Sequence, residues 1–367
     1  MVHNNISQDM DPGIWSQLPE ELLERVLSFL PLKTFLNLRS TCRNFNSLLF
    51  SPCFISKHSP SSSSPFSSFI LLSHPQFHQK CPLFNTVLSS WCNMSLSLPP
   101  MLSCPPFSNL LSSSNGLLCF SIPRSSCFIV CNLLARSTRR IKFPTCPFDF
   151  EFLTLVSTSN GYKLFMLSSF GSSTIHALVY DSVLRSWLQL DGCNQILSHS
   201  YYQKGAFYDK CLYFTTPEPF NVVYLDFDAG KWDRSKIELP RSLTFVRLVS
   251  DEDRKLYLIG GVGQSGISRS IKLWELGENG ENWVEKETLP EMICRKFVSV
   301  CYHNYEHVYC FWHQGLICVC CYTWPEILYY KVCRRTWHWL PKCPSLPDKW
   351  SCGFRWLPFK PELYSIV

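Results

Sequence analysis

The chain has 367 residues, of which 46% are hydrophobic and 17% charged, so it has enough apolar material for a large core and does not have a disordered composition. Its net charge of +6 comes from 34 basic and 28 acidic residues that are not clustered, so neither nucleic acid nor an anionic membrane is expected as a partner. No apolar run reaches the roughly 20 residues of a membrane helix, and the polar start MVHNNISQDMDPG lacks the core of a signal peptide. The composition favours a soluble intracellular protein.

Residues 1–13 are predicted to be disordered, and residues 14–57 to form short helices. Pro19 suits the first position of a helix, Glu20 and Glu21 complement the helix dipole, and Pro31 ends this helix. A second apolar run covers residues 32–38, and a third begins near Cys42 and ends at Ser51-Pro52. In the first helix the apolar side chains at 3.6-residue spacing form one stripe, made of Leu22, Val26, Phe29 and Leu30 and widened by Leu23 and Leu27.

Three short helices cannot bury this much apolar surface among themselves, so they either bind a partner or pack on the domain that follows. Residues 18–54, LPEELLERVLSFLPLKTFLNLRSTCRNFNSLLFSPCF, resemble an F-box, the helical module that joins a protein to a cullin-based ubiquitin ligase. The resemblance implies binding to a Skp-family adaptor and, through it, to cullin and RING subunits. It assigns the adaptor contacts to Leu18, Pro19, Leu22, Leu23, Val26, Leu27, Pro31, Leu36 and Leu38, with further family positions at Arg39, Cys42 and Phe45.

The Ser- and Pro-rich residues 58–68 are predicted to be a linker, and the pattern of residues 69–367 is that of strands. Short runs rich in Val, Ile, Tyr, Phe and Leu alternate with Gly, Asn, Asp and Pro. Examples are FILL (69–72), GLLCF (116–120), IHALVY (175–180), VVYLDF (222–227) and EILYYKV (326–332). This density of strands, with no intervening helix, predicts an all-β domain.

The strands repeat. Trp187, Trp232, Trp283 and Trp337 follow one another at intervals of 45, 51 and 54 residues, and Trp91 precedes Trp187 by 96, which is two units of 48. An acidic or amide residue stands six positions before the Trp in Asn85/Trp91, Asp181/Trp187 and Asp226/Trp232; the variants are Lys331/Trp337, Glu275/Trp283 with an insertion, and Asn132/Thr138, which lacks the Trp. An apolar-Pro pair has the same period, at Leu98-Pro99, Phe143-Pro144, Leu239-Pro240, Leu289-Pro290 and Leu340-Pro341, with Leu190-Asp191 in the remaining slot. These features define six units.

A period of this length with about four strands per unit is typical of a β-propeller, here of six blades. The Asp or Asn is expected to form an Asx turn and the Trp to pack between blades. KLYLIGG resembles a kelch repeat, with its diglycine only in the fourth unit, and SSNGLLCF resembles the associated β-domain of plant F-box proteins. Residues 350–367 are expected to pair with strand 69–72 and to close the ring. The predicted repeat-core residues are Trp91, Trp187, Trp232, Trp283, Trp337, Gly260 and Gly261.

The motifs of catalysis and cofactor binding are missing. The sequence has no H-E-x-x-H, no G-x-S-x-G and no P-loop. Cys318 and Cys321 form a C-x-x-C near His313, but no second pair has the spacing of a zinc site, and the 20 cysteines are expected to be small core residues. We therefore expect no catalytic residue, metal or cofactor.

These observations favour the substrate-recognition subunit of an SCF-type (Skp–cullin–F-box) ligase, which binds its target protein through the propeller and leads to the target's degradation. A propeller-fold enzyme with a helical cap and an interaction scaffold with a vestigial F-box are the alternatives. The substrate is expected at loops of one end of the propeller, with residues 263–270, 277–282 and 344–353 as candidates. The plant resemblance implies the cytoplasm, the nucleus or both.

Overall fold

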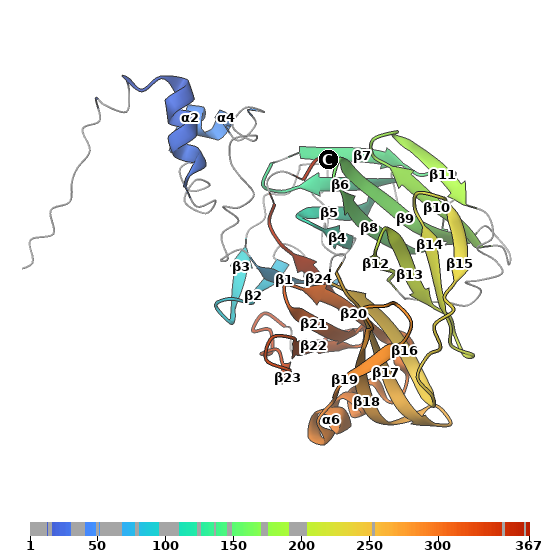
Figure 1. Ribbon diagram of the computed structural model, residues 1–367. Coiled ribbons are helices and arrows are strands. Elements are labelled where there is room, and N and C mark those ends of the chain that lie inside the picture. The colour runs from blue at the N-terminus through green and yellow to red at the C-terminus, as the bar shows by residue number, and fades with distance from the viewer. Residues whose placement is uncertain are drawn as a thin grey trace, which may run out of the picture. The chain divides into compact units, whose positions relative to one another are not determined.

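The chain divides into two compact units, residues 1–67 and 68–367, which are described one at a time (Figure 1). The structure is a computed structural model that describes residues 13, 17–30, 41–48, 51, 68–77, 81–94, 110–122, 126–135, 137–144, 149–169, 175–190, 204–251, 254–346, 349–362 and 365–367. The predicted disorder of residues 1–12 and the predicted linker up to Ser67 lie outside the described residues.

The first unit contains helices α2 (Glu20–Ser28) and α4 (Arg43–Leu48). Helix α2 begins after Pro19, whose carbonyl accepts the backbone N–H groups of Leu22 and Leu23 at 3.0 Å each. At the start of α4 the Sγ atom of Cys42 accepts the N–H of Phe45 at 3.4 Å, in the manner of an N-cap. The first and third predicted helices are thus confirmed, and the second, over residues 32–38, lies outside the described residues.

The second unit is a β-propeller of six four-stranded antiparallel sheets, as predicted (Figure 1). We number the blades in chain order and give each from its first to its fourth strand. They are blade 1, β24 (Arg355–Phe359), β1 (Phe69–Ser73), β2 (Cys81–Asn85) and β3 (Ser90–Met94); blade 2, β4 (Leu110–Ser114), β5 (Leu117–Ile122), β6 (Cys127–Asn132) and β7 (Ser137–Lys142); blade 3, β8 (Asp149–Thr158), β9 (Gly161–Ser169), β10 (Ile175–Asp181) and β11 (Ser186–Leu190); blade 4, β12 (Ala206–Tyr208), β13 (Cys211–Thr215), β14 (Val222–Asp226) and β15 (Lys231–Arg234); blade 5, β16 (Leu243–Ser250), β17 (Leu256–Gln264), β18 (Ile267–Leu276) and β19 (Trp283–Thr288); and blade 6, β20 (Val308–His313), β21 (Leu316–Cys321), β22 (Trp324–Lys331) and β23 (Thr336–Trp339). In five of the six pairs of successive blades the first strands contact one another, and together the first strands form the innermost layer.

Blade 1 closes the ring with strands from both ends of the domain. Strand β24 pairs with β1 in antiparallel register, from Phe69 opposite Phe359 to Ser73 opposite Arg355. This confirms the pairing predicted for residues 350–367, and it leaves no blade without its first strand.

Two expectations are wrong. The diglycine belongs to the fifth blade and not to the fourth, since the unit of Asn132 and Thr138 counts as the second blade. The domain also has an intervening helix, α6 (Glu291–Cys301), followed by the 3-10 turn η6 (Tyr305–His307), between blades 5 and 6. Helix α6 buries Cys294, Phe297 and Cys301, which recur at helical spacing. The sequence did not predict this helix, because the composition of the segment also suits a short apolar strand.

Six apolar clusters fill the propeller, and each one joins two neighbouring blades. In five of them the repeated Trp of one blade shares the cluster with the apolar residue that precedes the Pro or Asp in the previous blade. These pairs are Trp91 with Leu340, Trp187 with Phe143, Trp232 with Leu190, Trp283 with Leu239 and Trp337 with Leu289. The two periodic signals of the sequence are therefore the two halves of one inter-blade contact.

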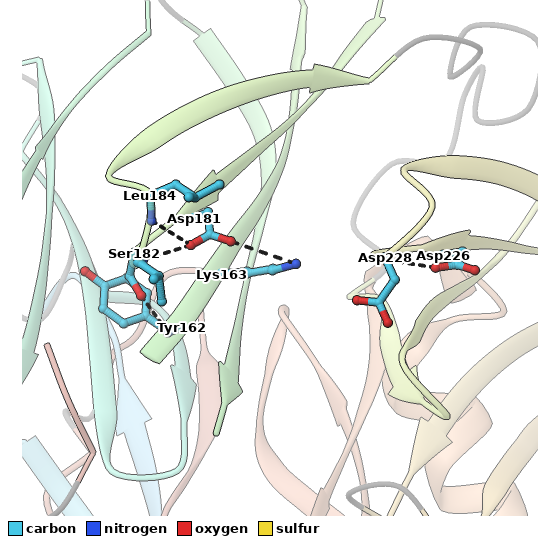
Figure 2. A network of polar contacts seen from close by, with 8 residues as sticks. Tyr162, Lys163, Asp181, Ser182, Leu184, Asp226 and Asp228 are labelled. Atoms are coloured by element: carbon cyan, nitrogen blue, oxygen red, sulfur yellow. Dashed lines mark hydrogen bonds and ion pairs between the residues drawn. The ribbon is translucent and has the colours of Figure 1, made fainter. Parts of the chain in front are cut away.

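In four blades the turn between the third and fourth strands is held by an Asp or Asn, as Figure 2 shows for blade 3. Asp181 Oδ1 accepts the N–H groups of Val183 at 2.8 Å and Leu184 at 3.1 Å. The same double hydrogen bond forms in blade 4, where the N–H groups of Asp228 and Ala229 lower the pKa of the Asp226 carboxyl. Asn85 and Asn132 do the same in blades 1 and 2, so the predicted Asx turn is confirmed in four blades.

The two ends of the propeller differ. One end, which we call the turn end, has the first-to-second and third-to-fourth turns, which are short; Asn115-Gly116 and Gln314-Gly315 both have the positive φ of tight hairpins. The opposite end, the loop end, has the second-to-third turns and every connection between blades. The longest connections, residues 95–109, 191–205, 289–307 and 340–354, all join strands at the loop end.

Replacing Trp232 by Ala is expected to lower the free energy of unfolding of the propeller by about 3 kcal/mol, because it empties part of the layer between blades 3 and 4. Thr138→Ala changes the same repeat position in blade 2, where the side chain is exposed, and should change that free energy by less than about 0.5 kcal/mol. Urea unfolding of the full chain measures both. Similar values for the two variants would contradict the repeat register.

Candidate partner-binding surfaces

Helix α2 carries two apolar stripes, and one of them is open to solvent. Leu22, Val26 and Phe29 are 49%, 41% and 76% exposed and follow one another at helical spacing. On the neighbouring face Leu27 is only 3% exposed, and Leu23 and Leu30 are half-buried. We call Leu22, Val26 and Phe29 the open stripe.

Polar contacts hold the buried side of α2. Glu24 is buried, and its Oε1 atom accepts a hydrogen bond from Ser51 Oγ at 3.3 Å. Ser28 Oγ donates to the Arg25 carbonyl at 2.7 Å. Because its buried side is fixed in this way, α2 exposes the open stripe to a partner without rotating about its own axis.

The predicted adaptor contacts divide along this line. Pro19, Leu22 and Val26 are exposed, while Leu18 and Leu23 are half-buried. The single stripe expected from the sequence is corrected, because Leu27 is buried and packs inside rather than facing outward. Pro31, Leu36 and Leu38 lie outside the described residues. Phe29, which the sequence places on the stripe but not among the adaptor contacts, follows the last residue of α2 and is more exposed than Leu22 or Val26.

The repeat-core residues lie where the inter-blade contacts are. Trp91 and Trp187 donate their indole N–H groups across the blade boundary, to the carbonyls of Pro341 at 2.9 Å and Lys142 at 3.0 Å. The buried indole N–H groups of Trp232, Trp283 and Trp337 have no partner in the described part of the chain, so these three contribute through packing. These tryptophans face other blades and not an open surface.

The diglycine is required by close packing. A Cβ atom on Gly261 would lie 2.1 Å from Ser268 Oγ and 2.4 Å from Thr244 Oγ1, two hydroxyls that hydrogen-bond each other at 2.6 Å. On Gly260 it would lie 2.9 Å from the Phe245 carbonyl oxygen. Both glycines therefore serve the fit of β17 against its neighbours.

The candidate substrate loops do not share one face. Residues 263–270 form the second-to-third turn of blade 5, and residues 344–353 belong to the connection into β24, so both lie at the loop end. Residues 277–282 form a third-to-fourth turn, which places them at the turn end. The sequence could not separate them, because only the strand count within the blade decides the end. Helix α6, which also lies at the loop end, exposes Met292 and Tyr302.

The cysteines of the strands are core residues. Cys318 belongs to the cluster between blades 6 and 1, and Cys321 to the cluster between blades 5 and 6, so the two point to opposite faces of β21 as predicted. Burial raises the pKa of Cys310 and Cys301 to about 12, which keeps both as unreactive thiols. Among the residues that the structure describes, no group of three or more His, Cys, Asp or Glu side chains is placed to hold a metal ion. Within the same residues, none of the helices has the length and hydropathy of a membrane span.

Comparison with known proteins gives the same division of the chain. The F-box domain family matches residues 15–57. An F-box/kelch-repeat protein of Arabidopsis thaliana is 54% identical over 366 residues, which cover 98% of this chain and 90% of the relative. The protein UNUSUAL FLORAL ORGANS of the same plant is 23% identical over 92% of this chain and 81% of its own, and the protein ABERRANT PANICLE ORGANIZATION 1 of Oryza sativa is 26% identical over 97% and 90%. F-box domains in general bind Skp1-type adaptors in SCF complexes.

Proposed function

We propose that this chain, which belongs to the F-box/kelch-repeat protein family, is a non-catalytic substrate-recognition subunit of an SCF-type ubiquitin ligase. The open stripe of α2, which lies inside the F-box match, is the observation that carries the proposal. In this role the first unit binds a Skp-family adaptor, which links the chain to cullin and RING subunits, and the propeller binds a target protein that is then degraded. The protein acts in the cytoplasm, the nucleus or both.

The open stripe suits a helix-in-groove interface. Three apolar side chains in a row on a fixed helix are the kind of anchor that fills a partner's pocket, and a few such residues supply most of the energy of an interface. The exposed ring of Phe29 extends the surface past the end of α2. An exposed apolar row of this kind lowers the solubility of a protein. A bound adaptor would cover the row and remove that effect.

The loop end is the surface that we assign to the target. Its long connections vary in length from blade to blade, whereas the turn end repeats the same short turns. Variable loops on a rigid scaffold are where binding specificity is usually placed. The mechanism is proximity, because a target held there is presented at high effective concentration to the conjugating enzyme, and this chain makes or breaks no bond.

The double variant Leu22→Ala/Val26→Ala is expected to weaken adaptor binding at least tenfold, because two anchors of the open stripe are removed. Binding is measured with purified Skp1-type adaptor by isothermal titration, and circular dichroism should show an unchanged helix content. Leu184→Ala removes an equally large exposed side chain from the propeller and should leave the affinity unchanged. Leu27→Ala should instead destabilise the first unit, by about 2–5 kcal/mol. Full adaptor affinity in the double variant would refute the proposed surface.

Changing the exposed residues of α6, in the double variant Met292→Glu/Tyr302→Asn, is expected to reduce the recovery of target proteins while adaptor recovery stays the same. The matched control is Val183→Ser/Leu184→Ser, which alters exposed residues at the turn end. The measurement is affinity purification with quantitative mass spectrometry after proteasome inhibition. Loss of targets in the control and not in the α6 variant would assign the target to the turn end.

A further inference from the structure

The centre of the propeller is a channel with a cavity of about 370 Å³. Residues from the first strand of every blade line it. In five blades the lining residues lie in the half of the first strand nearer the turn end, whereas in blade 4 they begin with Lys204 and Gly205, just before β12. This volume is at the lower end of the roughly 300–1,000 Å³ that small-molecule sites occupy.

The described lining of this cavity carries positive charge and no carboxylate. Lys204 and Lys360 line it, and the guanidinium of Arg355 is close enough to Lys204 to act on its charge. None of these three side chains forms an ion pair with a described Asp or Glu. His313 also lines the cavity, but burial lowers its pKa to about 4, so it is neutral at pH 7.

Lys204 is in an environment that does not favour a charge. Its ammonium lies 5.7 Å from the centre of the Tyr309 ring, and protein surrounds its side chain although part of it still meets water in the channel. Burial first, and then the charge of Arg355, lower the pKa of Lys204 to about 8. A partly desolvated cation without a counter-charge lowers stability, so its position calls for an anion.

Two buried hydroxyls of the cavity also have no partner. Thr154 Oγ1 and Ser250 Oγ make no hydrogen bond within the described residues. Other serines of the wall are used in the fold, since Ser112 Oγ and Ser114 Oγ accept the N–H groups of Leu155 and Ser157. Thr154 and Lys204 each stand four residues before the end of the first strand of their blades, at Thr158 and Tyr208, so they lie at a similar depth.

We propose that this channel binds a small anionic molecule that carries a phosphate or carboxylate group and at least one further hydrogen-bonding atom. Lys204 faces the anionic group, the nearby charge of Arg355 adds to the attraction, and the hydroxyls of Thr154 and Ser250 supply hydrogen bonds to the ligand. Such a ligand would supply a counter-charge to the lysine and hydrogen-bond partners to the two hydroxyls, which come from three successive blades. The site depends on the propeller alone, so its failure would leave the proposed ligase function untouched.

The test is isothermal titration of the full chain at constant ionic strength with sodium pyrophosphate and, separately, with sodium citrate. Binding of one equivalent of either compound supports the site and tells a phosphate ligand from a carboxylate ligand. No binding of either at millimolar concentration would overturn the proposal. Lys204→Met should weaken the affinity at least about tenfold, as expected for a lost hydrogen bond to a charged group, whereas the exposed Lys236→Met should not change it.

A second readout separates a binding role from a structural one. Without ligand, Lys204→Met and Thr154→Val should both raise the melting temperature at pH 7, since each removes an unpaired polar group that costs stability. A fall in both melting temperatures would identify the two residues as structural and would contradict the proposal. Unchanged affinity in both variants would also overturn it.

The affinity should also depend on pH. Because the pKa of Lys204 is about 8, the affinity for citrate should fall as the pH rises from 7 to 9, while Lys204→Arg keeps its charge and stays flat. The neighbouring Tyr309 on β20 and Cys320 on β21 do not interfere, since burial raises the pKa of both well above their usual values. The stability of the folded protein without ligand changes with pH in the opposite direction to the affinity. It increases above pH 8, because Lys204 loses its proton at lower pH in the folded chain than in the unfolded chain. The stability penalty of Lys204 is therefore largest at pH 7 and shrinks as the pH rises above 8. An affinity that falls equally in Lys204→Arg would show that Lys204 does not bind the anion.

Discussion

The apolar layer between neighbouring blades is the interaction on which the rest of this structure depends. A four-stranded sheet with two apolar faces has no stable form in water unless both faces are covered, and here each face is covered by the next sheet around the ring. The contact is specific because one blade supplies a Trp and the previous blade supplies the apolar residue at its exit. This arrangement fixes each blade against the last and holds the innermost strands around the channel.

Much of the fold could be predicted because its signals are local and repeated. The Asx turn needs only an Asp or Asn at a fixed offset from a strand, so Asp181 and Asp226 could be recognised from spacing alone. The Trp and the apolar-Pro pair recur because every blade boundary is built in the same way. Blade 2 was harder to count, since Thr138 replaces the Trp, but its Asn132 keeps the turn.

What could not be predicted depends on contacts between distant residues. Adjacent residues on a helix differ by about 100° in direction, so periodicity alone cannot decide whether Leu22 or Leu23, or Val26 or Leu27, faces inward. Helix α6 was missed because its cysteines and aliphatic residues also suit a strand. The channel was missed because Lys204, Thr154 and Ser250 come from three different blades, and only the closed ring brings them together.

The pairing of β24 with β1 also has a consequence for how the protein is made. The F-box is synthesised before the propeller, and blade 1 receives its inner strand only when Arg355–Phe359 has left the ribosome. A chain cut short near its C-terminus, by a premature stop codon or by proteolysis, would carry the complete F-box sequence on an open ring. Under the proposed function such a product would occupy the adaptor without a properly formed propeller, so the position of this single strand would make late truncations inhibitory rather than merely inactive.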